Sequence, residues 1–281
     1  TMPFPANVTS HEGTAPPTTR RRRWSGLQAA VTAWLGVAIV GQLIFATYVL
    51  LLYGGSAAAG RLAQWNAVTP RAWRPGETLG NLVFGSHVLF TVVIVLGGLI
   101  QLLPALRRRA PAWHRWNGRL YLLAAVVLAT GGVAMILTRG TVGGVWQQAG
   151  MALNGLVILV CAWMTWRHAR ARQLAQHRRW ALRLFLSVSG VWFFRIGLMA
   201  WLVVWRAPVG FDPATFSGPF LTALALAQFM LPLAVLELVF HAQASAQRGL
   251  RVAVAGLVAA LTVLTAMGIA AATAGMWWPR L

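Results

Sequence analysis

The sequence predicts an all-α protein: a polytopic transmembrane bundle of seven helices, with the N-terminus in the cytoplasm and the C-terminus outside. The first observation is composition, since the 281 residues are 58% hydrophobic and only 10% charged, as is typical of membrane proteins. The second is a series of seven apolar runs, each close to the about 20 residues that cross a hydrocarbon core of about 30 Å. The runs cover residues 27–53, 81–103, 119–138, 147–166, 181–204, 218–240 and 252–275.

The third observation is the distribution of arginine, which supplies all 24 basic residues. Arginine is concentrated in the leader and in alternate loops, and the positive-inside rule places such segments in the cytoplasm. These loops are expected to lie on the anionic headgroups of a bacterial inner membrane. Because membrane topology accounts for the net charge of +20, nucleic acid is not an expected partner. The arginine-rich segments are residues 20–23, 107–119, 167–183 and 248–251.

Residues 1–26 are expected to form a disordered, basic cytoplasmic leader, because they are rich in proline, threonine and small residues. Residues 27–281 then form a single transmembrane domain, with four core helices at about 81–204. The arginines at 20–23 and the first apolar run resemble a secretory signal, but this run is about twice the usual 7–15 residues. Cleavage near 57–59 would leave six helices and is the alternative.

The connections predict how successive helices are joined. A long outer loop at 54–80 follows the first helix, and a glycine turn at 139–146 makes the third and fourth helices an antiparallel hairpin. The sequence shows none of the gating helix breaks that transporters display, so each apolar run, including the fifth at 181–204, is expected to be an unbroken helix. Proline at 208 and 213 separates it from the sixth helix, and tryptophans anchor the C-terminal end at the outer surface.

Five polar side chains from five helices fall at similar depth in the outer half of the bilayer. At about 1.5 Å of rise per residue, His87 and Asn154 lie about 9–10 Å deep and Arg195 about 13 Å deep. An intramembrane arginine costs at least about 2.5 kcal/mol, so it must face the bundle and find partners. We therefore expect Arg195 and His87 to face one cavity open toward the outer leaflet. The predicted ligand site comprises Gln42, His87, Asn154, Arg195 and Gln228.

Two alternatives remain for these residues. Interhelical hydrogen bonding accounts for the amide side chains as well as ligand binding does. The charge of Arg195 has no carboxylate at its own depth, so Glu77 or Asp212 reaching inward, amide oxygens, or an anionic or carbonyl-bearing ligand must meet it.

Two similar segments open the third and fifth helices. Residues 114–120 and 177–184 each begin His-Arg, end Arg-Leu and carry a tryptophan between. Such an echo indicates a repeated pair of helices, although basic loops also resemble one another in composition. His114 and His177 are candidate heme ligands, and hydrogen bonding to phosphate or loop carbonyls is the alternative for both.

These two motifs, together with His87 and the glycine-rich run at 97–104, resemble a bacterial family of multi-pass membrane proteins known only as a domain of unknown function (twenty-three-oh-six). The resemblance covers roughly residues 80–200. It implies a membrane location and no established activity.

A looser similarity is to transmembrane b-type cytochromes of the ascorbate-reducible, ferric-reductase kind, in which four helices hold two hemes through paired histidines. Applied here, this similarity implies an inner heme b between His114 and His177, and His87 as an outer ligand. Asn154 lies where the outer partner would be, and an amide is not a usual axial ligand. A single inner heme is therefore the most that the resemblance implies, and no other metal is expected.

Two classes of function follow. The sequence favours a redox protein that binds heme b, a quinone, or both, because an arginine and a histidine in an apolar pocket suit a quinone carbonyl. The alternative is a non-enzymatic carrier of a small anion or lipid, or an accessory subunit of a larger complex. Carboxylate-pair catalysis is excluded in practice by a total of four acidic residues.

Overall fold

A computed structural model describes residues 25–140 and 143–281, and this part of the chain is helical without a strand. The predicted all-α class is confirmed. The predicted leader lies outside the described residues except for Ser25 and Gly26. The helices are α1 (Gly26–Val49), α2 (Gly55–Ala58), α3 (Thr78–Leu102), α4 (Pro104–Arg109), α5 (Pro111–Arg139), α6 (Val145–Arg170), α7 (Leu174–Val188), α8 (Gly190–Trp205), α9 (Pro219–Ala244) and α10 (Arg248–Ala272).

Local sequence sets several of the helix ends. Ser25 accepts a hydrogen bond from the backbone of Gln28 at 3.2 Å, and Gln28 accepts one from the backbone of Ser25 at 3.3 Å. This reciprocal pair is a capping box and begins α1. Proline is the first residue of α4, α5 and α9, where its missing N–H leaves no donor unsatisfied. A π-helical turn, Leu50–Gly54, carries α1 into α2.

The chain is a multi-pass membrane protein. Six helical segments are long and apolar enough to cross a bilayer, and α7 with α8 makes a seventh span if this bent pair counts as one. The segments are Gly26–Ala58, Thr78–Leu102, Pro111–Arg139, Val145–Arg170, Pro219–Ala244 and Arg248–Arg280.

The expectation of a continuous fifth helix is wrong, because α7 and α8 are bent by 52° at Ser189. The hydroxyl of Ser189 donates to the carbonyl of Phe185 at 2.8 Å, a contact with the preceding turn that often bends helices. A β-carbon on the next residue, Gly190, would lie 2.6 Å from the amide nitrogen of Asn154. Because Gly190 has no β-carbon, the Asn154 side chain of α6 can approach the backbone at the bend.

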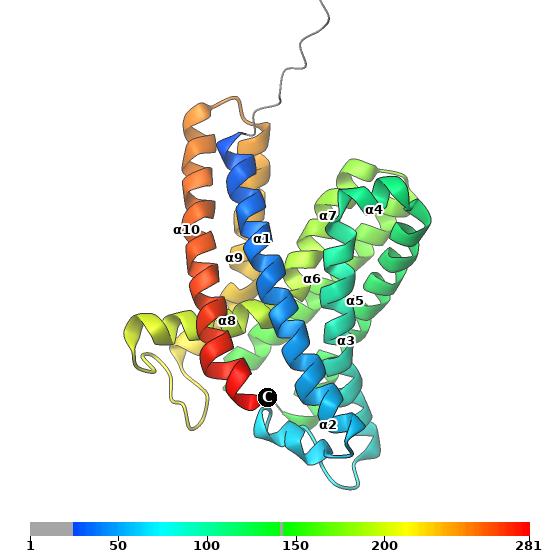
Figure 1. Ribbon diagram of the computed structural model, residues 1–281, viewed down its shortest axis with the longest axis vertical. Coiled ribbons are helices and arrows are strands. Elements are labelled where there is room, and N and C mark those ends of the chain that lie inside the picture. Colours follow the sequence, from blue (N-terminus) through cyan, green and yellow to red (C-terminus); the bar gives the residue numbers. More distant parts are fainter. Residues whose placement is uncertain (1–24, 141–142) are drawn as a thin grey trace, which may run out of the picture.

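The helices form two groups that meet at the end of the molecule carrying residues 59–77 and the C-terminus, here called the loop end (Figure 1). One group comprises α3, α5, α6 and α7, and the other comprises α1, α9 and α10 (Figure 1). The groups diverge toward the opposite end, here called the arginine end because its loops hold residues 107–119, 167–183 and 248–251 (Figure 1). Helix α8 leaves the first group at the bend and packs against α10 and α9.

Small residues let the helices pack closely, as is usual in membranes. A β-carbon at Gly268 of α10 would lie 2.5 Å from the carbonyl oxygen of Ile196 in α8. Ala124 and Ala125 of α5 are fully buried in the first group. The outward faces carry exposed apolar side chains such as Leu82 and Leu123, as expected for surfaces in contact with lipid.

The predicted sidedness is tested by cysteine labelling. The native Cys161 is buried, so its replacement by serine gives a background without an accessible thiol. Cysteine at the exposed Ala214 should react with a membrane-impermeant thiol reagent added outside, and cysteine at the exposed Gln173 should react only after the membrane is opened. Labelling of position 173 in intact cells, with position 214 protected, would refute the orientation.

Candidate functional site

A cavity of about 270 Å³ lies between α3, α5, α6, the α7–α8 bend and α1. It extends from Tyr121 and Ile158 within the bundle to Pro70 and Gly140 at the loop end. Its lining is mainly apolar. Four of the five residues predicted to form one ligand site line it, namely Gln42, His87, Asn154 and Gln228.

His87 of α3 packs its ring against the backbone of α5 where that helix has two glycines. A β-carbon at Gly131 or Gly132 would lie 3.7 Å or 3.4 Å from the ring, so glycine gives the ring its place. The Nδ1 of this ring is buried and has no partner among the described residues. This nitrogen is therefore available to a molecule in the cavity.

The three amide side chains gather around the α7–α8 break. Gln42 donates from Nε2 to the hydroxyl of Ser189 at 2.9 Å, and Asn154 donates from Nδ2 to the carbonyl of Ser187 at 3.2 Å. Gln228 donates to a carbonyl of its own helix α9 at 2.8 Å. The carbonyl oxygens of Asn154 and Gln228 are buried without a partner in the described chain. Asn154 thus binds the backbone and Gln42 the Ser189 side chain at the break, while two amide oxygens remain without a partner in the described chain.

Five residues of the cavity lining carry a buried polar atom with no hydrogen-bond partner in the described chain. Leaving such an atom unpaired costs about 1–3 kcal/mol, and native proteins pair nearly all of them. Their concentration around one cavity indicates a place where polar groups of another molecule are received. The atoms are His87 Nδ1, Tyr121 Oη, Asn154 Oδ1, Trp192 Nε1 and Gln228 Oε1.

Arg195, the fifth predicted residue, is not among the residues that line this cavity. Its guanidinium lies over the ring of Phe45, with Cζ 5.5 Å from the ring centroid, and donates to the carbonyl of Val191 at 3.3 Å. Phe45 and Val191 both line the cavity, so Arg195 lies next to its wall, and its charge is close enough to act on His87. The structure places four of the five residues in the cavity lining and Arg195 beside it.

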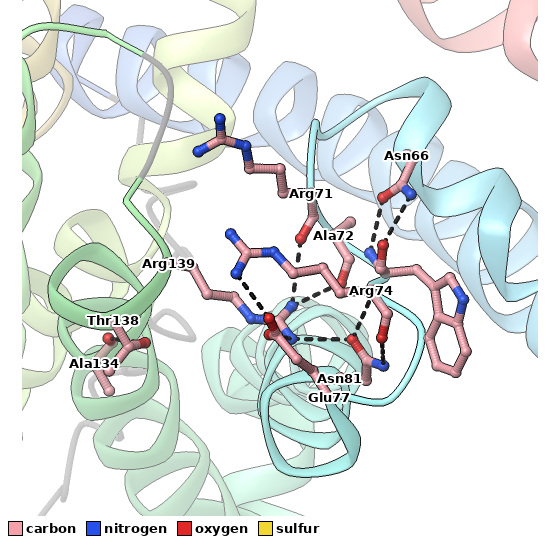
Figure 2. A network of polar contacts seen from close by, with 10 residues as sticks. Asn66, Arg71, Ala72, Arg74, Glu77, Asn81, Ala134, Thr138 and Arg139 are labelled. Atoms are coloured by element: carbon pink, nitrogen blue, oxygen red, sulfur yellow. Dashed lines mark hydrogen bonds and ion pairs between the residues drawn. The ribbon is translucent and has the colours of Figure 1, made fainter.

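A polar network at the loop end joins α5 to the loop at 59–77 and to the start of α3 (Figure 2). Arg139, the last residue of α5, donates to the carbonyl of Ala72 at 2.9 Å, to Asn81 at 3.0 Å and to Glu77 at 3.1 Å. Asn81 also donates to the carbonyl of Arg74 at 2.7 Å. One side chain of α5 thereby fastens the loop at 59–77 and the start of α3. We call these contacts the Arg139 latch.

Sequence reasoning missed this latch because Glu77 and Arg139 are 62 residues apart. The latch also identifies the partners of Glu77. A hydrogen bond from Arg74, together with the charge of Arg139, holds the pKa of the Glu77 carboxyl below its ordinary value. Glu77 therefore does not reach inward to Arg195.

The two remaining candidates, His114 and His177, lie toward the arginine end, away from the cavity. His177 of α7 bonds through Nδ1 to the carbonyl of Thr165 at 3.0 Å, so its Nε2 is the nitrogen that remains. His114 of α5 has a buried Nδ1 without a partner in the described chain, and its carbonyl accepts from Gln101 at 2.8 Å. Among the described residues no group of three or more His, Cys, Asp or Glu side chains could hold a metal ion.

Residues 84–231 match the model of a protein family described as "Predicted membrane protein (DUF2306)". This match spans more than half of the 281 residues. The chain belongs to this family. No curated protein and no solved structure matches it. The family region runs from α3 into α9 and thus contains the α7–α8 break and the residues His87, Asn154 and Gln228. Gln42 of α1 and the loop at 59–77 lie outside the family region.

Proposed function

We propose that this membrane protein binds a small amphipathic molecule with a carbonyl-bearing ring, of the quinone class, and takes part in membrane electron transfer in a bacterial inner membrane. The observation that carries the proposal is the set of five unpaired polar atoms around one mainly apolar cavity. Pockets for small ligands combine an apolar lining with a few convergent polar groups in this way.

The polar atoms suit both oxidation states of a quinone. Tyr121 and Trp192 offer an O–H and an N–H, which can donate to quinone carbonyls. Asn154 and Gln228 offer carbonyl oxygens, which can accept from the hydroxyls of a quinol. His87 can do either, and an imidazole is the side chain best suited to exchange a proton near neutral pH. The apolar wall would receive the ring and the start of a tail.

The proposal predicts saturable binding of a short-chain quinone to the purified full chain in nanodiscs, measured by calorimetry. Replacing His87 by phenylalanine or Asn154 by leucine should weaken binding about tenfold, because each change removes a polar contact inside an apolar cavity. Ser86→Ala is the matched control, since Ser86 is exposed and bonds only within its own helix α3. Equal affinity in His87→Phe, Asn154→Leu and wild type would rule out this site.

A second candidate is heme b held by His114 and His177, which would supply one-electron transfer when bound. The Thr165 carbonyl holds the ring of His177 through Nδ1 and leaves Nε2 free. Histidines that bind a metal commonly bond a backbone carbonyl through their other ring nitrogen in this way. We expect a b-type absorbance spectrum from protein made in heme-replete cells, lost in both His114→Ala and His177→Ala. Colourless, iron-free protein would end this proposal and leave the quinone proposal standing.

The non-enzymatic alternative, a carrier of a small anion or lipid or an accessory subunit, draws support from the α7–α8 break. Discontinuous helices beside a polar cluster are the form in which many transporters bind substrate. Quinone binding without any change of redox state in the presence of donors would favour this alternative.

A further inference from the structure

Arg195 has no acidic partner among the described residues, although it lies within a membrane-spanning segment. Three acidic residues belong to the described chain, and each is engaged elsewhere. Glu77 pairs with Arg74 and Arg139, and Glu237 pairs with Arg183. Asp212 accepts from the backbone of Ala214 and the hydroxyl of Thr215, each at 2.9 Å. The charge of Arg195 is therefore met only by the Val191 carbonyl and the face of Phe45.

The neighbours of Arg195 include a tyrosine hydroxyl, which can donate or accept a hydrogen bond, and an indole N–H, which only donates. Tyr48 and Trp277 are buried, with 3% and 1% of their surface exposed. The Oη atom of Tyr48 and the Nε1 atom of Trp277 lack a well-aligned hydrogen-bond partner within the described chain. Their rings stack with centroids 6.2 Å apart, and Trp277 also contacts Phe45 at 5.4 Å. Since Arg195 lies over the same Phe45 ring, the guanidinium and both buried donors belong to one cluster.

A second arginine completes the cluster. Arg280, three residues after Trp277, lies beside the hydroxyl of Tyr48 and within electrostatic range of Arg195. Its own hydrogen bond, to the Met276 carbonyl at 2.9 Å, uses one of the five N–H groups of a guanidinium. Two like charges close together repel. An anion bound between them would be attracted by both, and these attractions would offset the repulsion.

We propose that Arg195, Arg280, Tyr48 and Trp277 bind a phosphate-type oxyanion at the loop end of the bundle. Within this cluster only the Tyr48 hydroxyl can accept a hydrogen bond, so donors and two positive charges outnumber the acceptors. Arginine binds phosphate through paired N–H groups, and hydrogen bonds between charged groups are about twice as strong as neutral ones. The site is distinct from the quinone cavity, because none of these four residues lines that cavity.

The oxyanion could be the headgroup of a phospholipid or free phosphate, and two titrations of the full chain distinguish these sources. Native mass spectrometry in detergent measures the binding of phosphatidylglycerol. Tryptophan fluorescence in nanodiscs of a phosphate-free galactolipid measures the binding of inorganic phosphate. We expect one saturable site in at least one titration, weakened about tenfold or more by Arg195→Leu. Tyr48→Phe, which removes one oxygen, should weaken binding about threefold.

Arg61→Leu is the matched control, because Arg61 is an exposed loop-end arginine, and binding should be unchanged. Binding of phosphatidylglycerol alone assigns the site to lipid, and binding of phosphate in galactolipid assigns it to the free anion. The proposal is overturned by no saturable binding, or by Arg195→Leu and Tyr48→Phe binding as wild type does. Should Arg195→Leu fail to fold, Tyr48→Phe and Arg280→Leu decide. His87→Phe, which tests the quinone cavity, should leave this binding intact, so either proposal can fail alone.

Discussion

Replacing Gly268 by alanine is expected to lower the free energy of unfolding by about 1–3 kcal/mol. The new β-carbon would lie 2.5 Å from the carbonyl oxygen of Ile196 and 3.1 Å from its carbonyl carbon. These are backbone atoms within α8, so they cannot rotate away as a side chain could. Helix α10 must therefore move off α8, and the contacts around this crossing are weakened. Denaturation of purified protein in mixed micelles measures the change.

The matched control is Gly256→Ala on the same helix. No atom lies within 4 Å of a β-carbon at Gly256, so only helix propensity changes, which favours alanine by up to about 1 kcal/mol. Equal destabilisation of both variants would show that the close approach of α10 to α8 does not determine stability there.

Removing the Arg139 latch is the second change with a large expected effect. Arg139→Leu deletes the hydrogen bonds to Ala72, Glu77 and Asn81 and leaves the half-buried loop backbone without its donors. It also frees Arg71, which is held at a φ of +64° that non-glycine residues rarely adopt. We expect trypsin to cleave after Arg71 at least about tenfold faster than in wild type, because proteolysis follows local opening.

A control variant sharpens this test. Thr138→Val changes the neighbouring residue, whose exposed hydroxyl bonds only within α5, and should leave cleavage unchanged. If Arg139→Leu also leaves cleavage unchanged, the loop is held by other contacts.

The latch should also respond to acid. Because the pKa of Glu77 is lowered in the folded protein, its stabilising contribution is present at neutral pH and is lost as pH falls through that pKa. The hydrogen-exchange protection factors of residues 59–77, which correct for the slower intrinsic exchange in acid, should therefore fall below about pH 4.5, the ordinary pKa of a glutamate. In Glu77→Gln this acid step should be absent.

Most of the fold could be predicted from the sequence, because an apolar run of about 20 residues with few charges is typical of a helix that crosses a membrane. Depth also follows from residue counts, and this is why the sequence alone groups His87, Asn154, Gln42 and Gln228. The direction in which a side chain points around its helix does not follow from depth. Arg195 illustrates the difference, since its guanidinium lies over the ring of Phe45 and the residue is not part of the cavity lining.

The break at Ser189 could not be predicted for a related reason. Serine and glycine are common inside membrane helices and are usually accommodated without a bend. Here the bend is accompanied by a contact from Asn154, which is 33 residues away in sequence from the Ser187 carbonyl that it binds. The Arg139 latch has the same character, because no local pattern tells which loop an arginine will fasten.

The slant of α8 has a consequence for the bilayer around the protein. Its 16 residues make a helix about 24 Å long, which at 52° to α7 advances only about 15 Å along the axis of that helix. The exposed Arg206 comes directly after α8, and the exposed Asp212 lies in the loop that follows, so water or headgroups must reach both side chains. The neighbouring α10 has 25 residues and is about 37 Å long. Such hydrophobic mismatch is relieved by local thinning, so the membrane should be thinner beside α8 than beside α10.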